Sequence, residues 1–305
     1  MSQRAFLIHA LSPLHPGTGQ ALGNIDLPIA RYRATQIPYL PGSSIKGVMR
    51  DALRPAEDTG DAMHLQRAIF GPDIGKKEDA AEHAGAVVFG DARLLALPVR
   101  SLRGTFAWVT SPMLLRLART DMGASEAVCP VPAFPVRERV ARVATDSALL
   151  EGKHVFFEDM ERAATPGDDA VSKWGELLGT ALFGAAHATF TERLAIVDDE
   201  TMTFFWETCT QVDARVRLNE SHVVQKGALW YEESLPAETV LVGLASASRP
   251  YRYLDAERKV RMTQTADDLL THCLGDVRSN LQFGGKATVG RGRARVVPLA
   301  AGGAP

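Results

Sequence analysis

Residues 4–54, RAFLIHALSPLHPGTGQALGNIDLPIARYRATQIPYLPGSSIKGVMRDALR, decide the fold class of this chain. Residues 4–12, RAFLIHALS, predict a first strand with Phe6, Ile8 and Ala10 on one face. The loop that follows carries three prolines after Asp26, and these argue against a long helix there. The last twelve residues predict a helix at 43–54 that begins at an N-cap, Ser43, and ends before Pro55.

The rest of the chain adds strands and helices in turn. Strands are predicted at 85–99 and 103–111, and Pro112 after Ser111 opens a second helix. This βαββα order continues to βαββαβ in the ferredoxin-like layout. Further helices are predicted around 60–70, at 168–186 and at 265–275. The last of these begins with a capping box of Thr265 and Asp268. A β-rich region is predicted at 193–247. We therefore predict an α+β fold with a ferredoxin-like or RRM-like sheet.

The composition is typical of a globular protein and excludes several classes. Of the 305 residues, 46% are hydrophobic and 23% are charged, so wholesale disorder is excluded. The formal net charge of -2 excludes a strongly basic, histone-like protein. Cys129, Cys209 and Cys273 lie far apart and lack zinc-site spacing. No apolar run approaches the roughly 20 residues of a membrane helix, and no signal peptide is apparent, so a cytoplasmic protein is expected.

Charge is distributed unevenly along the chain. Both ends are locally cationic, with Arg4, Arg31, Arg33, Lys46 and Arg50 near the start, and Arg278, Lys286, Arg291, Arg293 and Arg295 near the end. If the first and last strands pair, the two ends form one basic surface suited to a phosphate backbone. The alternative is two unrelated solvated faces.

The predicted helix at 43–54 has the features of a phosphate-binding element. Lys46, Arg50 and Arg54 recur every four residues and form one basic stripe. Gly42 and Ser43 lead into a helix N-terminus whose N–H groups point to solvent, with Lys46 one turn further on. Neither GTGQALG nor PGSSIKG has the spacing of a dinucleotide fingerprint or a P-loop, so a nucleotide-binding enzyme is not indicated.

The segment FGGKATVGRGRAR at 283–295 supplies glycines that allow a close approach by an anionic backbone. Arg291, Arg293 and Arg295 alternate and are expected on one face. The alternative is a flexible hairpin with a solvated basic strand. Aromatic residues make up only 7% of the chain, so RNA binding would depend on phosphate and sugar contacts rather than on base stacking.

Asp26 is the one acidic residue among the first fifty and lies between basic flanks. Three interpretations compete. It could form a local salt bridge to Arg31 or Arg33, hold a divalent ion against a phosphate, or orient or deprotonate a ribose 2′-OH. His15, in the same loop, could assist. No Ser/His/Asp triad and no close carboxylate pair accompany it.

The motif LxPLHPGTGQxLGxIDLPIxRxRxTxxPYLPGSSIKGVMR at 11–50 resembles the start of the RAMP-superfamily backbone subunit of type III-B CRISPR effector complexes, the Cmr type. FGGKATVGRGR at 283–293 is similar to the glycine-rich loop of that superfamily, and RVRLN with GALWYEESLP is similar to its thumb segment. The resemblance extends from end to end and is most specific in 6–50 and 282–293.

This resemblance implies a single domain over 1–305 with an RRM-like palm and inserted thumb and finger segments. The expected parts are a palm at about 1–55, 85–122 and 240–298, insertions at about 56–84 and 123–190, a thumb at about 213–238, and a disordered tail at 299–305.

The resemblance also implies a set of functional residues. Asp26 corresponds to the aspartate that cuts target RNA with a divalent metal, Mg or Mn, and His15 corresponds to the family's loop histidine. RNA-binding residues are expected at Ser43, Ser44, Lys46, Arg50, Arg217, Gln225, Trp230, Tyr231, Gly284, Gly285, Lys286 and Arg291.

The implied function is that of a metal-dependent endoribonuclease in antiviral defence. Several copies would form a filament along CRISPR RNA, and each would cut the complementary target RNA at regular intervals. The implied partners are CRISPR RNA, target RNA, other copies of the chain and other type III effector subunits, namely the large polymerase-like, small and remaining RAMP subunits. Two alternatives are a non-catalytic scaffold subunit of the same filament and a RAMP-type endonuclease that processes CRISPR RNA.

Overall fold

The structure is a computed structural model that describes residues 1–18, 25–56, 60–72, 84–134, 139–250, 263–275 and 278–299. Its α-helices are α1 (Gly42–Ala52), α2 (Asp61–Phe70), α3 (Pro112–Met122), α4 (Asp169–Phe183), α5 (Ala188–Thr191), α6 (Asp199–Thr208) and α7 (Ala266–Leu274). Its strands are β1 (Ser2–Ala10), β2 (Tyr39–Leu40), β3 (Val87–Phe89), β4 (Ala92–Arg100), β5 (Phe106–Thr110), β6 (Val140–Val143), β7 (His154–Phe157), β8 (Met160–Pro166), β9 (Leu194–Ile196), β10 (Gln211–Leu218), β11 (Val224–Ser234), β12 (Val240–Ala247), β13 (Arg278–Gln282) and β14 (Arg293–Pro298).

The centre of the fold is an antiparallel sheet in the order β14-β1-β12-β4, with α1 and α7 on one face. This is the ferredoxin-like order, in which the strands β1, β4, β12 and β14 and the helices α1 and α7 make the βαββαβ unit. The predicted fold is confirmed, but the prediction placed β5 and α3 inside this unit. Both belong to an inserted part, because strand order depends on pairing across more than a hundred residues.

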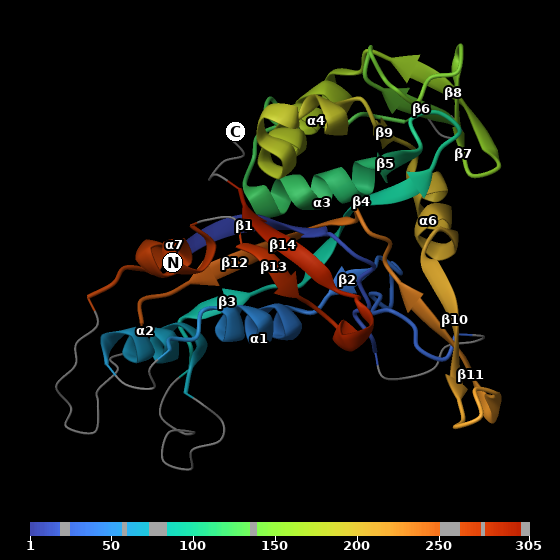
Figure 1. Cartoon of the computed structure of the whole chain (residues 1–305). Helices are drawn as coiled ribbons and strands as arrows, with labels where there is room; N and C mark the ends of the chain where they lie inside the picture. The colour runs from blue at the N-terminus through green and yellow to red at the C-terminus, as the bar shows by residue number, and fades with distance from the viewer. Residues whose placement is uncertain are drawn as a thin grey trace.

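The inserted part continues the central sheet beyond β4 through β5, β9, β6, β8 and β7 (Figure 1). Here β5 and β9 pair in parallel, as do β6 and β8. α3 and α4 pack on the sheet face opposite α1 and α7, around a second hydrophobic cluster that includes Trp108 and Trp174. Because helices cover both faces, the central sheet offers no open platform for stacking bases.

Strand β1 shows how both faces are filled. Phe6, Ile8 and Ala10 face the α1 and α7 side, as the alternation predicts. Leu7 faces the α3 and α4 side. β1 pairs with both β12 and β14, so the two ends of the chain lie together in the sheet.

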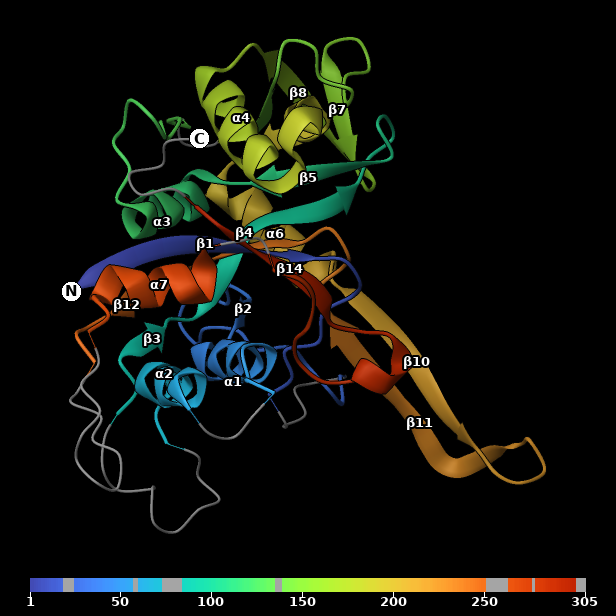
Figure 2. The ribbon, with the colours of Figure 1, turned by 60° about the vertical axis from the view of Figure 1, so that its left-hand side comes forward.

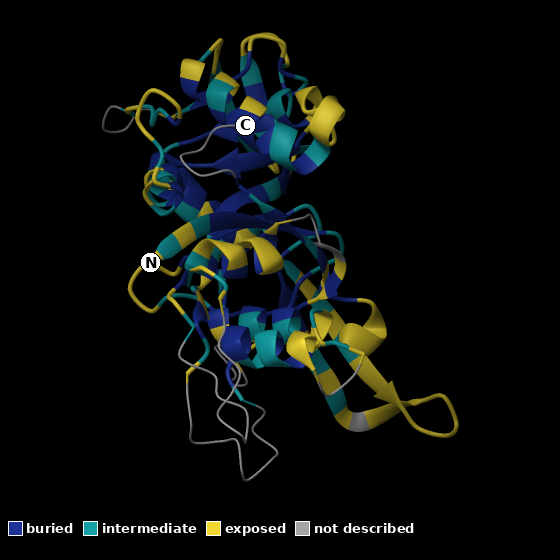
Figure 3. Cartoon of the chain, turned by 90° about the vertical axis from the view of Figure 1, so that its left-hand side faces the viewer, coloured by how far each residue is buried: buried dark blue, intermediate teal, exposed yellow. Residues whose placement is uncertain are grey.

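The hairpin of β10 and β11 projects from the body of the molecule (Figure 2) and is largely exposed (Figure 3). Its register divides it into two faces. One face pairs Ala214 with Tyr231 and Val216 with Leu229, and the opposite face pairs Arg215 with Trp230. Val216 and Leu229 are about half exposed, at 48% and 55%. The hairpin therefore has one apolar face and one polar face.

Three local predictions need correction. α1 begins at Gly42 after an N-cap at Pro41, and the carboxylate of Asp91 accepts from Gly42 N at 2.8 Å, so Ser43 is not the cap. α6 interrupts the predicted β-rich region and is capped by Asp198, which accepts from the backbone N–H of Thr201. Leu299, placed in the predicted tail, is buried.

Other local predictions hold. α7 has the capping box of Thr265 and Asp268, and α3 has Pro112 at its first position after Ser111. Residues 57–59 and 73–83 of the predicted insertion, and 300–305 of the predicted tail, lie outside the described residues.

Candidate active site

Four segments meet at the root of the β10–β11 hairpin, namely residues 13–15, the loop with Asp26, the end of β11 and the glycine-rich loop. Leu14 and Leu235 exchange backbone hydrogen bonds at 2.8 Å in both directions. Gly292 N donates to Pro13 O at 2.8 Å, and Gly285 N donates to His15 O at 3.0 Å. The loop that contains Asp26 follows the free edge of β11. Both ends of the chain thus contribute to one site.

The Asp26 loop is held along β11 like a short parallel strand. Leu27 N donates to Tyr231 O at 3.1 Å, and Glu233 N donates to Leu27 O at 3.0 Å. The exposed carboxylate of Asp26 accepts from Tyr231 N at 2.8 Å through Oδ2. The local salt bridge considered from the sequence does not form, because Arg31 pairs with Glu233 and none of the described cations pairs with Asp26. Oδ1 of Asp26 is therefore available for chemistry.

His15 lies on the same strand edge as Asp26. Its side chain is 5% exposed, and Nδ1 lies 2.6 Å from Glu233 O. A carbonyl oxygen only accepts, so Nδ1 carries the proton and Nε2 is the ring nitrogen that can accept one. Tyr231 and Glu233 are two residues apart, which is roughly 7 Å along a strand. The structure thus brings the two predicted catalytic residues to one edge.

The glycine-rich loop closes over this site from the polar face of the hairpin. Gly285 N contacts His15 O, and Lys286 Nζ lies 2.8 Å from Glu232 Oε1. Glu232 is 2% exposed. Burial raises the pKa of Glu232, but hydrogen bonds from Lys286 and Trp230, with the charges of Lys286 and Arg215, outweigh it and hold the pKa below its usual value.

The three terminal arginines have different surroundings, contrary to the prediction that they share one face. Arg291 precedes β14 and is 4% exposed; it donates to Ser234 Oγ at 2.7 Å and pairs with Asp213. Arg291 thus has an internal role, and its contact with RNA stays a prediction. Arg295 donates to His9 Nδ1 at 3.1 Å and to a backbone carbonyl, whereas Arg293 is exposed.

The predicted basic surface is therefore smaller than the sequence suggests. Its premise holds, because the first and last strands pair. Several of its cations are nevertheless bound internally, among them Arg4 to Asp267 and Arg31 to Glu233. Pairing with distant acids, which no local pattern reveals, removes much of the expected positive field.

At the N-terminus of α1, Ser43 is exposed, and Ser44 and Lys46 are half-buried. Burial, and then the charge of Arg50, lower the pKa of Lys46. Asp91 already accepts from Gly42 N at this helix end, so any phosphate would meet a carboxylate nearby. The RNA contacts of Ser43, Ser44 and Lys46 stay predictions.

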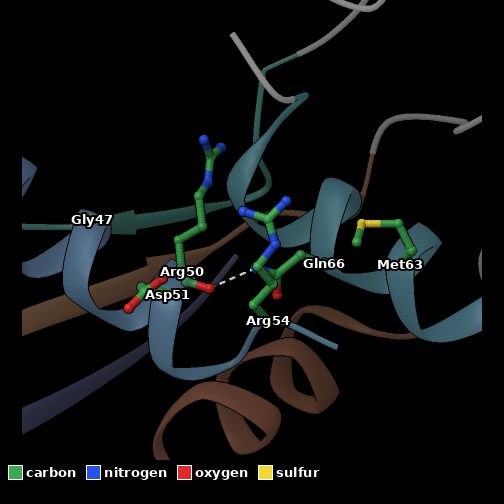
Figure 4. A pocket seen from close by; sticks show the side chains of 6 residues that line it. All are labelled: Gly47, Arg50, Asp51, Arg54, Met63 and Gln66. Carbon is green, nitrogen blue, oxygen red and sulfur yellow. Dashed lines mark hydrogen bonds between the residues drawn. The ribbon is translucent and has the colours of Figure 1, made fainter. Parts of the chain in front are cut away.

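Arg50 connects α1 to α2. Its Nη2 donates to Phe70 O at 2.5 Å and to Gly71 O at 3.1 Å, and Gln66 Nε2 donates to Arg50 O at 2.7 Å. Beside it lies a cavity of about 180 Å³ between the two helices (Figure 4). Arg50 thus has an internal role, and its contact with RNA stays a prediction.

The four predicted hairpin residues are distributed over both faces. Trp230 donates to Glu232 Oε1 at 2.7 Å on the polar face. Tyr231 is on the opposite face and 41% exposed. Arg217 and Gln225 are exposed toward the tip. These four side chains therefore do not form one common surface.

The donor set does not fit a divalent ion held by this chain alone. No group of three or more His, Cys, Asp or Glu side chains suited to a metal occurs within the described ranges. At the site itself, one oxygen of Asp26 accepts from Tyr231 N, and Nδ1 of His15 bonds to Glu233 O. Asp26 has one oxygen without a hydrogen bond, and a single carboxylate holds Mg²⁺ only together with phosphate oxygens and waters.

Sequence reasoning missed Glu232 and Glu233 as members of the site. They lie in WYEESLP between apolar residues, and two adjacent acids on a strand are typical of a solvated edge. Their burial was not visible from the sequence, because their partners Lys286 and Arg31 come from opposite ends of the chain.

Comparisons with known proteins cover nearly the whole chain. The RAMP superfamily model matches residues 7–295. Over 302 residues, 96% of this chain and 95% of the relative, the chain is 32% identical to the CRISPR system Cmr endoribonuclease Cmr4 of Pyrococcus furiosus. The crystal structure of oligomeric Cmr4 from Pyrococcus furiosus matches with a TM-score of 0.70 at 25% identity, over 98% of each chain.

A chain of a type III-B Cmr-beta complex bound to cognate target RNA shares the fold, with a TM-score of 0.70 at 18% identity over 98% of this chain and 97% of that one. None of the helices that the structure describes combines the length and hydropathy needed to cross a membrane. The family match covers nearly the whole sequence, and the relative at 32% identity covers almost all of it as well. The chain therefore belongs to the RAMP superfamily.

Proposed function

We propose that this chain is an RNA-cutting backbone subunit of a type III-B CRISPR effector complex. It binds CRISPR RNA, assembles in several copies along it, and cuts the paired target RNA at regular intervals. The observation that carries the proposal is the exposed carboxylate of Asp26, which one backbone N–H orients and no described cation neutralises. Support comes from the relative named as an endoribonuclease, and from the similar structures of oligomeric Cmr4 and of a complex bound to target RNA.

Asp26 acts as the proton acceptor in this mechanism. Its Oδ1 takes the proton of a target ribose 2′-OH, and the 2′ oxygen attacks the adjacent phosphorus in line. The bond from phosphorus to the 5′ oxygen breaks, and that oxygen takes a proton from solvent. The products are a 2′,3′-cyclic phosphate and a 5′-OH. The hydrogen bond from Tyr231 N holds the carboxylate in one orientation, which is what proton abstraction from a fixed ribose requires.

His15 is a second group for proton transfer. Its Nδ1–H is bound to Glu233 O, so the same side chain can accept a proton only at Nε2. Ser43, Ser44, Lys46 and the glycine loop at 284–286 would hold the CRISPR RNA backbone. Other type III effector subunits would bind the same filament.

A divalent ion, Mg²⁺ or Mn²⁺, is retained as a proposal for the complex with RNA, in which phosphate oxygens add ligands to Asp26. Such an ion would supply charge neutralisation at the reacting phosphate. None of the steps above depends on it. Chelation by EDTA tests this requirement separately, since a metal-dependent complex stops cutting and a metal-independent one does not.

The test is target-RNA cleavage by a reconstituted complex that carries Asp26→Asn or wild-type subunit. The asparagine keeps an oxygen for Tyr231 N and cannot accept the 2′-OH proton, so cutting should fall at least 100-fold while RNA binding is retained. Asp159→Asn, at an exposed position between β7 and β8, is the matched control and should cut normally. Wild-type cutting by an assembled Asp26→Asn complex would remove the catalytic assignment.

One observation favours a second function, that of a scaffold subunit without cutting activity. The Asp26 carboxylate anchors its own loop by accepting from Tyr231 N, and this structural role is a sufficient reason for an aspartate at that position. In that case the wild-type complex and the Asp26→Asn complex would both bind target RNA without shortening it.

A further inference from the structure

Two adjacent glutamates at the root of β11 are almost completely buried. Glu232 is 2% exposed and Glu233 is 3% exposed. Their side chains project to opposite sides of the strand. Glu232 binds Lys286 of the glycine loop, whereas Glu233 binds the segment that follows Asp26. Buried carboxylates are rare unless they are bonded, so each has a specific role.

The carboxylate of Glu233 accepts three hydrogen bonds. Oε2 accepts from Ile29 N at 3.0 Å. Oε1 accepts from Arg31 Nη2 at 2.5 Å and from Thr210 Oγ1 at 2.9 Å. Two of these donors lie three and five residues after Asp26. The third, Thr210, lies just before β10, so the carboxylate joins the loop to both strands of the hairpin root.

The backbone explains why a side chain is needed here. Leu27 N donates to Tyr231 O, and Glu233 N donates to Leu27 O, which are two successive bonds of a parallel ladder. The next bond of that ladder would run from Ile29 N to Glu233 O. That carbonyl is instead bound by His15 Nδ1 at 2.6 Å. Ile29 N therefore turns to the carboxylate of the same residue.

Because the carboxylate of Glu233 takes the place of its carbonyl as the acceptor for Ile29 N, we propose that Glu233 is a positioning residue for both Asp26 and His15. Its carboxylate completes the ladder in place of its own carbonyl, and this releases the carbonyl for His15. Both side chains can then occupy one strand edge. The inference rests on the proposed cutting function, and Glu233 acts through the two residues rather than on RNA.

The first test compares Glu233→Gln with wild type in the reconstituted complex. Glutamine keeps an oxygen for Ile29 N but loses the ion pair to Arg31, so the loop should loosen. We expect the single-turnover cutting rate at saturating complex to fall at least ten-fold, with target-RNA affinity within two-fold of wild type. Glu232→Gln is the contrast, since it frees Lys286 on the opposite side of β11 and should change RNA affinity without a ten-fold loss of cutting rate. Glu151→Gln, which removes an exposed ion pair to Arg103, should change neither.

A second readout does not depend on cutting. Amide hydrogen exchange of peptides that contain Leu27 and Ile29, measured by mass spectrometry in the assembled complex, should become faster in Glu233→Gln. If Asp26→Asn cuts normally while Glu233→Gln still accelerates exchange, the proposed function fails and the positioning stands. Wild-type exchange together with a wild-type rate in Glu233→Gln would overturn the inference.

A milder variant covers the case in which Glu233→Gln does not assemble. Arg31→Lys keeps the charge beside Glu233 but loses the planar guanidinium. Arg31→Lys should lower the cutting rate, by less than Glu233→Gln does, and leave the target-RNA affinity unchanged. Amide exchange at Ile29 should also become faster. Equal losses of rate and affinity in Arg31→Lys would contradict positioning and indicate a general loss of folding.

Discussion

Gly284 and Gly290 have similar backbone conformations in one loop but very different surroundings. Their φ values are +71° and +82°, both in the region that favours glycine. A Cβ at Gly284 would lie 2.3 Å from His15 O, whereas no atom lies within 4 Å of one at Gly290. Gly284→Ala should therefore destabilise the protein much more than Gly290→Ala.

The difference can be worked out from these contacts. Alanine in a left-handed conformation costs about 1 kcal/mol at either position. At Gly284, the new Cβ must also retreat by about 1 Å to reach the 3.4 Å at which ordinary contact begins. That shift strains the 3.0 Å bond from Gly285 N to His15 O. Overpacking and the weakened bond add about 2 kcal/mol, so the total is about 3 kcal/mol.

Thermal unfolding followed by tryptophan fluorescence measures this difference. In a chain of this size, 1 kcal/mol corresponds to a shift of about 2 °C in Tm. Gly290→Ala should thus lower Tm by about 2 °C, and Gly284→Ala by about 6 °C. Equal shifts for the two variants would refute the close packing of the glycine loop on His15.

Two further predictions concern charge. Lys46→Ala should weaken RNA binding and reduce the slope of log affinity against log salt by about 0.7 to 0.9, the value for one phosphate contact; an unchanged slope in a salt titration would contradict a contact by Lys46. Because the folded state lowers the pKa of Glu232, this residue stabilises the protein above its unfolded pKa of about 4.3, and the stabilisation disappears as the pH falls through the lowered value. Urea unfolding of wild type and Glu232→Gln should therefore differ at pH 7 and converge in acid, and a constant difference down to pH 3 would show that the charge is unimportant.

Local patterns predicted the elements of the fold well, and long-range pairing was the source of error. The period of two along residues 6–10 predicted which face of β1 packs against α1 and α7, and capping residues predicted where α3 and α7 begin. The sequence carries no comparable signal for which strands lie at the centre of a sheet. The N-cap at Ser43 failed for the same reason, because Asp91, which binds the helix end, lies 49 residues away.

In the candidate site, too, local patterns predicted some residues, and those that depend on long-range contacts were missed. Asp26 stood out because it is isolated among basic residues, and His15 because it shares the loop. Glu233 could not be found this way, since its role depends on Ile29 and Arg31 more than 200 residues earlier. Arg291 looked like a surface cation, and only the fold places Asp213 and Ser234 against it.

The pairing of β1 with β12 and β14 has a consequence for synthesis on the ribosome. Residues 2–10 emerge first, yet their neighbours at 240–247 and 293–298 are translated last. At about 5–20 residues per second, the nascent chain carries an unpaired apolar strand for roughly 15–60 seconds. A product that ends before residue 231 would lack the edge of β11 to which the Asp26 loop is bound, so the candidate site forms only after about three quarters of the chain has been synthesised.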